Sequence, residues 1–379
     1  MAAGYKSGEI NFETIINVIE EFISYYAYFD ENRKLPTINK SFFSSRFENN
    51  LLNFSIVGGG EKHGYQLEIP KGIEYPFAKL ALSNQSPAQF YFQHLLSVLL
   101  TNINSQISKY SYHTTGKSVI DSKSFLNQNF KKWYRSISED SLVRMYTLNY
   151  DRLFKILAEQ AGTSVFEGFE CGEFVPHDDV SPDIRRILLD FDSPIYYNLH
   201  GSAFWQVHPR DEYSQLKSLR ISLRPYPVLE MNNSENPVMQ IDRGKNIVVS
   251  NIITGYQKTQ KSFITPFKQM QAAFDKDCFL ADELLIIGYS FGDYHINASV
   301  VSALRHNQSL KLKFIDPAYC EKDGMRGYDL LGDKLINIFP EVFSLERTQP
   351  IYSEDDDTCT YFNDRLTVTS IGFDSYLGK

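Results

Sequence analysis

Three short clusters of polar residues each follow an apolar stretch of the chain, and their side chains are of kinds that do chemistry. They are Thr147–Asp151 (TLNYD), Leu199–Ser202 (LHGS) and Gly288–Asp293 (GYSFGD). A carboxamide such as that of Asn149 can position a water or a hydroxyl at a reacting carbon. A histidine such as His200 can accept a proton near neutral pH, because its unperturbed pKa is about 6.5. The three clusters are therefore candidates for a functional site.

The third cluster offers binding groups, since Gly288 lets backbone approach a ligand and the Ser290 hydroxyl can bond to ligand oxygens. Ordinary structural roles are an alternative for all three clusters. Asn149 and Asp151 are common helix N-cap types, a histidine before glycine is common in turns, and Ser290 or Asp293 could cap a helix. Each cluster alone is therefore a weak signal of function, and a functional interpretation depends on the order of the three clusters and on the strands that precede them.

The elements that would position these clusters are short apolar strands alternating with helices after residue 140. We predict strands at 142–148, 195–199, 246–253, 284–287 and 310–315, and helices at 151–161, 266–279 and 293–306. Such alternation predicts a parallel α/β sheet, with the wholly apolar segment 284–287 as a central buried strand and 310–315 closing the series. In such sheets ligands bind outside the carboxyl ends of the strands, where the polar clusters stand.

The first 140 residues have a different pattern and contain no recognisable chemistry. Apolar residues at helical spacing predict helices over about 12–30, 87–110 and 123–137, and the alternating segment 52–69 with Gly58–Gly60 predicts a hairpin. We therefore expect a mostly helical region over 1–140, an α/β core over 141–325 and a C-terminal extension over 326–379.

Composition narrows the classes of function. A net charge of −8 argues against a dedicated nucleic-acid binder, so we expect no direct nucleic-acid binding. The four cysteines are far apart, which disfavours a zinc ribbon or a disulfide framework and fits a reducing compartment. With neither a signal peptide nor 18 consecutive apolar residues, the chain is expected to be cytoplasmic and free of membranes. We expect no metal.

One competing enzyme class shares the third motif. Gly288–Gly292 also matches the G-x-S-x-G nucleophile elbow of α/β-hydrolases, and it follows a buried strand as that motif requires. Those enzymes place an acid and then a histidine after the serine. Only His295 and His306 follow Ser290, both in the next predicted helix, so a triad cannot be assembled in chain order.

Taken in order, the three clusters resemble the sirtuin (SIR2-like) family, specifically the SIR2-like domains of bacterial anti-phage defence proteins. Sirtuins carry a T-x-N-x-D segment, a catalytic His-Gly and a later G-[TY]-S turn after a buried strand. The bacterial group extends these to N-Y-D, L-H-G-S-x-x-W and G-Y-S-x-x-D-x-x-I-N. Here they read Asn149–Asp151, Leu199–Trp205 and Gly288–Asn297, so the resemblance covers about residues 141–320 and implies a Rossmann-like parallel sheet.

The resemblance implies cleavage of the nicotinamide–ribose bond of NAD, through an oxocarbenium-like state such as glycoside hydrolysis uses. It assigns catalysis to Asn149 and His200, and it places Asp316 on a ribose hydroxyl. The full set of implied cofactor-binding positions is Thr147, Asp151, Gly201, Gly288, Ser290, Asp293 and Asp316. We expect His295 and Asn297 to contact the loop before their helix and not to take part in catalysis.

The sequence departs from the family at one important place. Sirtuins begin with a strand and a G-A-G-x-S loop whose amides hold the NAD phosphates. We find no such segment here, and Gly58–Gly60 predicts a hairpin turn instead. Either the chain begins after that loop or the loop was lost; the joint presence of Asn149, His200 and Ser290 favours the first. A missing core strand should expose a sheet edge or be compensated by a partner. The paired-cysteine zinc module is absent too, which favours NAD hydrolysis over deacetylation.

The sequence therefore supports two hypotheses about function. The first is an NAD+ glycohydrolase of anti-phage defence, homo-oligomeric and in complex with a HerA-type hexameric ATPase, a partner implied by the resemblance. The second is a catalytically impaired SIR2-like scaffold that assembles around a helicase or nuclease partner. Nuclease activity of the chain itself has no metal-ligand cluster to support it.

Overall fold

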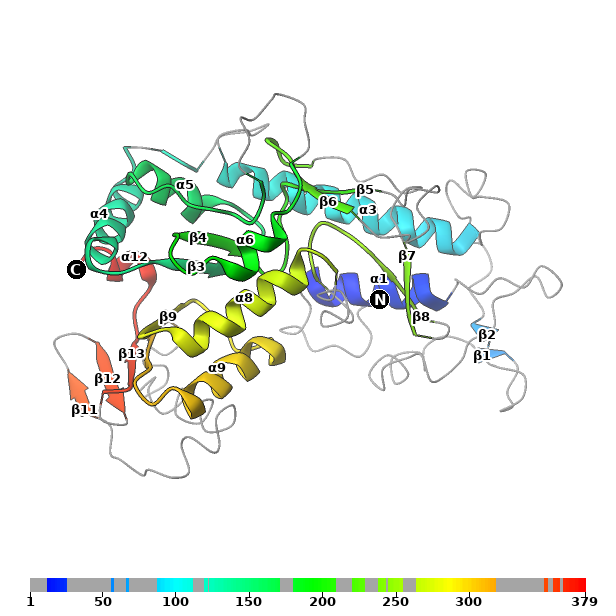
Figure 1. Ribbon diagram of the computed structural model, residues 1–379. Helices are drawn as coiled ribbons and strands as arrows, with labels where there is room; N and C mark the ends of the chain where they lie inside the picture. Colours follow the sequence, from blue (N-terminus) through cyan, green and yellow to red (C-terminus); the bar gives the residue numbers. More distant parts are fainter. Residues whose placement is uncertain are drawn as a thin grey trace.

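The computed structural model describes residues 12–25, 56–57, 66–67, 87–111, 119–121, 123–170, 180–208, 220–228, 238–242, 245–254, 264–317, 351–353, 357–361 and 364–379 (Figure 1). Within them the chain folds as the alternating pattern predicts, into an α/β core with parallel strands and covering helices. Two sheets contain the parallel strands.

The larger sheet has five strands in the order β11-β12-β13-β10-β9. Its parallel part consists of β9 (Glu283–Ile287), β10 (Lys311–Ile315) and β13 (Leu366–Thr369), and its antiparallel edge of β12 (Thr358–Tyr361) and β11 (Ile351–Ser353). In register, Leu312 of β10 lies between Leu284 of β9 and Leu366 of β13. Apolar side chains thus line up across the three parallel strands.

The smaller sheet pairs β3 (Arg144–Thr147) in parallel with β4 (Ile195–Asn198). All four residues of β4 are buried, and a further parallel bridge joins Phe166 to Ile195 on its other side. Neither β3 nor β9 has a second strand neighbour among the described residues, and β3 and most of β9 are only half-buried. Each is therefore an open sheet edge in the part of the chain that the structure describes.

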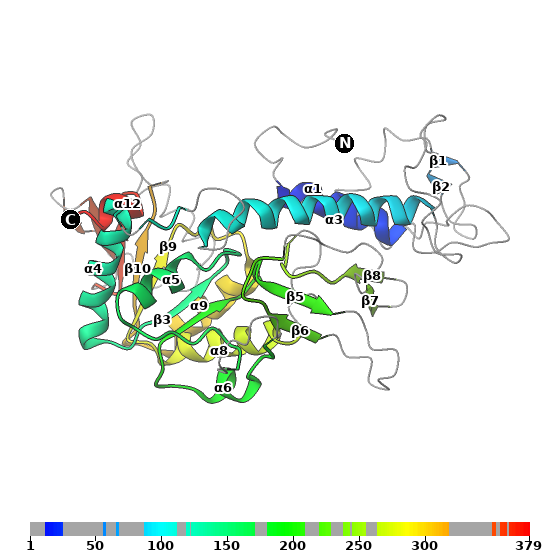
Figure 2. The same cartoon turned by 90° about the horizontal axis from the view of Figure 1, so that it is seen from above.

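Helices α8 (Phe267–Leu280), α9 (Tyr294–His306) and α6 (Ile184–Leu189) pack on this core, and α8 lies beside α9 (Figures 1 and 2). The sequence of α9 explains why this helix packs on the core. Its apolar residues Ile296, Val300 and Ala303 recur at helical spacing and are all buried in the main hydrophobic cluster. Trp205 lies in the same cluster, with its ring centroid 5.1 Å from that of Phe267.

The N-terminal half supplies a pair of helices, α1 (Phe12–Tyr25) and α3 (Pro87–Ile107), which lie alongside each other in Figure 2. The 3-10 turn η5 (Ser108–Tyr110) follows α3. The two helices bury an apolar cluster that also takes in two residues of the core, Tyr150 and Ile252. The helical periodicity predicted both helices, although residues 26–30 of the first lie outside the described part.

At the other end of the core, α4 (Phe125–Asp140) packs on α5 (Leu153–Gln160) and on the short C-terminal helix α12 (Phe373–Tyr376). The contact is aromatic, with the Phe130 ring 5.1 Å from that of Phe154 and the Trp133 ring 5.4 Å from that of Phe373. The C-terminal extension therefore returns to pack on the segment before β3.

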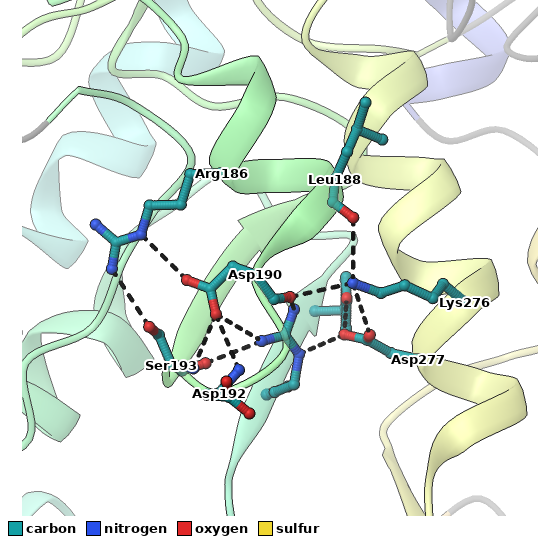
Figure 3. Close-up of polar contacts among 9 residues, drawn as sticks. Arg186, Leu188, Asp190, Asp192, Ser193, Lys276 and Asp277 are labelled. Carbon is teal, nitrogen blue, oxygen red and sulfur yellow. Dashed lines mark hydrogen bonds and ion pairs between the residues drawn. The ribbon is translucent and has the colours of Figure 1, made fainter.

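A cluster of charged residues ties the beginnings of β3 and β4 to α8 (Figure 3). The Arg144 guanidinium pairs with Asp277 and, at 3.7 Å, with Asp190. The Lys276 ammonium donates to the Asp190 carbonyl at 3.1 Å. Since Arg144 begins β3, the cluster lies at the opposite end of the strand from the polar cluster Thr147–Asp151.

Three antiparallel hairpins complete the described strands: β1 (Ile56–Val57) with β2 (Gln66–Leu67), β5 (Trp205–His208) with β6 (Arg220–Leu223), and β7 (Val238–Asp242) with β8 (Lys245–Val248). The first is the hairpin expected over 52–69. The last corrects the predicted strand 246–253, because β8 ends at Val248 and pairs antiparallel with β7, outside the parallel series.

Two further strand predictions need correction. Segment 284–287 is a parallel strand, but among the described residues it is half-buried and lies at the edge of its sheet, because strand order depends on which distant segments pair and not on the apolar sequence of the strand itself. The parallel strands do not end with β10 at residue 315 either, since β13 from the C-terminal extension pairs in parallel with β10. Its alternating Leu366–Thr369 pattern is too short for the period to stand out. The boundaries 1–140, 141–325 and 326–379 stay predictions. Among the described residues, none of the helices is long and apolar enough to cross a bilayer.

Candidate active site

The loops that follow the parallel strands of both sheets meet at one place. The His200 ring, in the turn after β4, lies 5.8 Å from the His295 ring in the first turn of α9, which follows β9. The carboxyl ends of the two sheets therefore face a common region, as expected for an open α/β sheet. His200 is only 3% exposed, so its imidazole is held within the protein.

The loop after β3 is fixed to the turn after β4 by a buried amide that the sequence did not single out. Asn198, the last residue of β4, donates from Nδ2 to the carbonyl of Asn149 at 2.9 Å and to that of Asp151 at 3.0 Å. The Leu199 amide donates to the Thr147 carbonyl at 2.9 Å. Each hydrogen bond of a buried amide contributes about 1 kcal/mol to stability, and loss of the amide leaves its partner carbonyls buried without a donor. The first two clusters are thus one hydrogen-bonded unit.

Tyr150, in the middle of the first cluster, is bonded to the same turn. Its carbonyl accepts from the Ser202 hydroxyl at 3.1 Å and from the Ala203 amide at 2.9 Å. Burial first, and then the negative charges of Glu13 and Asp293, raise the pKa of the Tyr150 hydroxyl, while the Thr254 hydroxyl lowers it. Glu13 of α1 and Asp293 at the start of α9 therefore both act electrostatically on the Tyr150 hydroxyl.

The predicted site residues of the first cluster occupy distinct positions. The Thr147 hydroxyl accepts the Asn149 amide at 3.0 Å and so shapes the loop, while Asn149 is exposed. Asp151 accepts the Leu153 amide at 2.8 Å at the start of α5, but the N-cap residue of that helix is Arg152, so Asp151 lies one residue before the capping position open to it from the sequence. Burial raises the pKa of Asp151, against the hydrogen bonds that lower it. Whether Asp151 also contacts a ligand stays a prediction.

The His200–Gly201 turn is held by residues 251–253, which lie within the segment 246–253 predicted as a strand. The Asn251 carbonyl accepts from the Ser202 amide at 3.0 Å, and the His200 carbonyl accepts from the Ile253 amide at 2.6 Å. Gly201 has φ of 85°, and a Cβ there would lie 2.2 Å from the Asn251 carbonyl oxygen. Glycine is required at Gly201 for both reasons, backbone conformation and space.

The third cluster forms the loop between β9 and α9. Gly288 and Ser290 are exposed, and the Gly288 amide donates to the Ile315 carbonyl at 3.0 Å, next to Asp316 at the end of β10. Asp293 is the residue before α9, and its side chain makes no helix-capping hydrogen bond. The structure thus places Asp316 beside the loop that holds Gly288 and Ser290, as the strand order β10-β9 requires.

Residues that sequence reasoning missed share one property: they hold the loops and are not themselves at the surface. Asn198, Asn251 and Thr254 are all at most 3% exposed. A buried polar residue next to a motif is a signal in principle, but the sequence does not show which polar residues are buried. No cluster of three or more histidine, cysteine or acidic residues that could hold a metal occurs among the described residues.

Comparison with known families agrees with this geometry. The family model described as SIR2-like domain matches residues 143–315, which run from the beginning of β3 to the end of β10 and include all three clusters. No curated protein matches the chain. The SIR2-like likeness is consistent with an NAD-related function and with the α/β fold observed.

Proposed function

We propose that this chain is a SIR2-like NAD+ glycohydrolase that cleaves NAD+ to nicotinamide and ADP-ribose. One observation carries the proposal: the Asn149 loop and the His200 turn form one hydrogen-bonded unit that faces the loop after β9. This unit lies within the segment that matches SIR2-like domains.

The chemistry assigned to each residue follows from its group and its position. The exposed Asn149 carboxamide orients a water, or a ribose hydroxyl, at C1′ of the ribose. As the bond from C1′ to the nicotinamide nitrogen breaks, nicotinamide leaves with the bonding electrons and the ribose passes through an oxocarbenium-like state. Water adds at C1′, and His200 takes up the proton that the water gives up. Ser290, Gly288 and Asp316 bind the sugar and phosphate oxygens.

The biological setting is also proposed, on the resemblance alone. The chain would deplete NAD+ during phage infection, as a homo-oligomer in complex with a HerA-type ATPase. Its net charge of −8 supports the expectation that any DNA contact comes through the partner. This proposal is tested by measuring cellular NAD+ after phage infection, in cells with and without the genes for this chain and for the ATPase.

The enzymatic proposal is tested by incubating NAD+ with the purified chain, alone and assembled with the ATPase, and measuring nicotinamide and ADP-ribose by chromatography. Asn149→Ala and His200→Ala should each lower the rate roughly 100-fold or more, the usual contribution of a positioned general base or its equivalent. Matched controls are Asn102→Ala at an exposed position of α3 and His306→Ala in the last turn of α9, which should leave the rate unchanged. Activity that survives both site substitutions would refute the assignment.

The scaffold function is favoured by one observation. In the described part of the chain β3 and β9 are open edges, and apolar β9 residues are only half-buried. An edge of this kind is a docking position for another strand. Calorimetry decides between the two functions: absence of NAD binding to both the chain and the assembled complex supports the scaffold.

A further inference from the structure

The loop Gly288–Asp293 has a backbone that needs support. Gly288 and Phe291 both have φ of 60°, in the left-handed region. For glycine this conformation is ordinary, but for phenylalanine it costs energy and persists only where surrounding contacts hold it. The Phe291 side chain is buried, with its ring 5.2 Å from that of Phe314 on β10. Ser290, between them, is exposed to solvent.

Two side chains make the contacts that hold this loop. The Tyr289 hydroxyl accepts the Asp293 amide at 3.2 Å and lies 2.8 Å from Oδ1 of Asn297, to which it donates. Nδ2 of Asn297 donates to the Phe291 carbonyl at 2.9 Å. Asn297 therefore bonds simultaneously to the strained residue, Phe291, and to Tyr289, the second residue of the loop. The Asp293 carbonyl, 3.1 Å from the Tyr289 hydroxyl, accepts the Asn297 amide and so begins α9.

Further contacts make this set of bonds stable. Asn297 is 9% exposed, so its amide bonds are shielded from water. The Tyr289 ring lies 5.0 Å from the Phe291 ring. Burial raises the pKa of the Tyr289 hydroxyl, which therefore stays protonated and able to donate. The hydroxyl and the carboxamide form one continuous chain of bonds, from the Asp293 amide to the Phe291 carbonyl.

We propose that Tyr289 and Asn297 are positioning residues, which hold the Gly288–Asp293 loop in the one conformation that presents Ser290 and the exposed loop backbone to the ribose or phosphate oxygens of the dinucleotide. The proposal rests on the proposed function for the identity of the ligand. It assigns neither residue a contact with the ligand, because both are turned into the protein by the bonds described.

The test uses variants that keep side-chain size. Tyr289→Phe removes only the hydroxyl, and Asn297→Leu replaces the carboxamide by an apolar group of similar volume. Tyr294→Phe is the matched control, since Tyr294 is in the same region but 85% exposed. Two readouts are taken: hydrogen–deuterium exchange of the peptide covering 288–297 without ligand, and KM and kcat for NAD+ cleavage by the assembled enzyme.

Tyr289→Phe should raise exchange in this peptide and not elsewhere, and should raise KM about 3- to 10-fold, the effect of one neutral hydrogen bond. The kcat should stay within about twofold, because the loop binds substrate and transition state alike. The double variant Tyr289→Phe/Asn297→Leu should lose less thermal stability than the sum of the losses in the two single variants, because the Tyr289–Asn297 hydrogen bond that both remove is counted only once. Its KM should stay high.

A merely structural role predicts a different result: lower thermal stability in the single variants with KM unchanged, which overturns the proposal. Unchanged exchange in Tyr289→Phe overturns it as well. If the wild-type protein neither binds nor cleaves NAD+, the proposed function fails, and the exchange experiment alone still decides the loop. In that case raised exchange confined to 288–297 supports the positioning role, and unchanged exchange refutes it.

Discussion

Replacing Asp190 by asparagine should destabilise the protein by about 2 kcal/mol at pH 7 without affecting the site. The Asp190 carboxylate accepts the Ser193 amide at 2.9 Å, the Asp192 amide at 3.1 Å and Nε of Arg186 at 3.1 Å (Figure 3). Burial opposes its ionisation, but these hydrogen bonds, together with that of the Ser193 hydroxyl, outweigh burial and lower the pKa from 3.8 to about 2. A shift of this size corresponds to about 2 kcal/mol.

The sign of the pH dependence follows from the direction of the shift. Because the folded-state pKa of Asp190 lies below the unfolded value, its contribution is complete above about pH 4 and is lost as the pH falls toward 2. At pH 3 roughly half of the contribution should remain. The asparagine variant has no such carboxylate, so the difference in unfolding free energy between wild type and variant should shrink from pH 7 to pH 3.

Urea unfolding followed by circular dichroism at pH 7, 5, 4 and 3 measures this difference. Asp192→Asn is the matched control: Asp192 is two residues away and exposed, so its substitution should change the unfolding free energy by less than about 0.5 kcal/mol. The reasoning is refuted if Asp190→Asn behaves as Asp192→Asn does at pH 7, or if the difference does not narrow in acid. NAD+ cleavage should be retained by the Asp190 variant, because the cluster lies at the other end of β3 from Asn149.

Two more substitutions test the site and its support. Gly201→Ala should destabilise the protein more than Gly288→Ala does in thermal unfolding. The new Cβ at position 201 would lie 2.2 Å from the Asn251 carbonyl oxygen, whereas a Cβ at position 288 would meet no atom within 4 Å beyond its chain neighbours. Equal effects of the two substitutions would contradict the close contact between the His200–Gly201 turn and Asn251. Ile252→Ala should cost about 2–5 kcal/mol in urea unfolding, because Ile252 is 0% exposed where the core meets α1 and α3, whereas Ile15→Ala at an exposed position should cost little.

The sequence predicted the elements of the fold well, because each carries its own periodic pattern. The spacing of Ile16, Ile19 and Ile23 is enough to place a helix, and an apolar run before a polar cluster is enough to place a strand. Strand order has no such local signal. The position of β13 beside β10, and that of β9 at an edge among the described residues, depend on which distant segments pair.

The candidate site shows the same division between local and distant information. Asn149, His200 and Ser290 could be selected from motifs, since the chemistry depends on residue type. The residues that hold these three in place could not be selected from the sequence. Asn198, for example, is an asparagine at the end of a predicted strand, and only the structure shows that its amide donates to two carbonyls. Asn251 is a similar case, because its carbonyl clamps a turn about 50 residues earlier in the chain.

The half-buried state of β9 connects the fold to the question of activity. Its Leu284–Ile287 run is apolar at every position, which is the composition of a strand covered on both faces and paired on both edges. Within the described residues it is paired on one edge only, and β3 is open in the same way. Two loops of the candidate site, those of Asn149 and Ser290, begin at the ends of these two strands, so a partner that pairs with both edges would fix these loops relative to each other. For this reason NAD+ cleavage by the assembled complex, compared with cleavage by the chain alone, is the measurement that separates an enzyme requiring assembly from a scaffold.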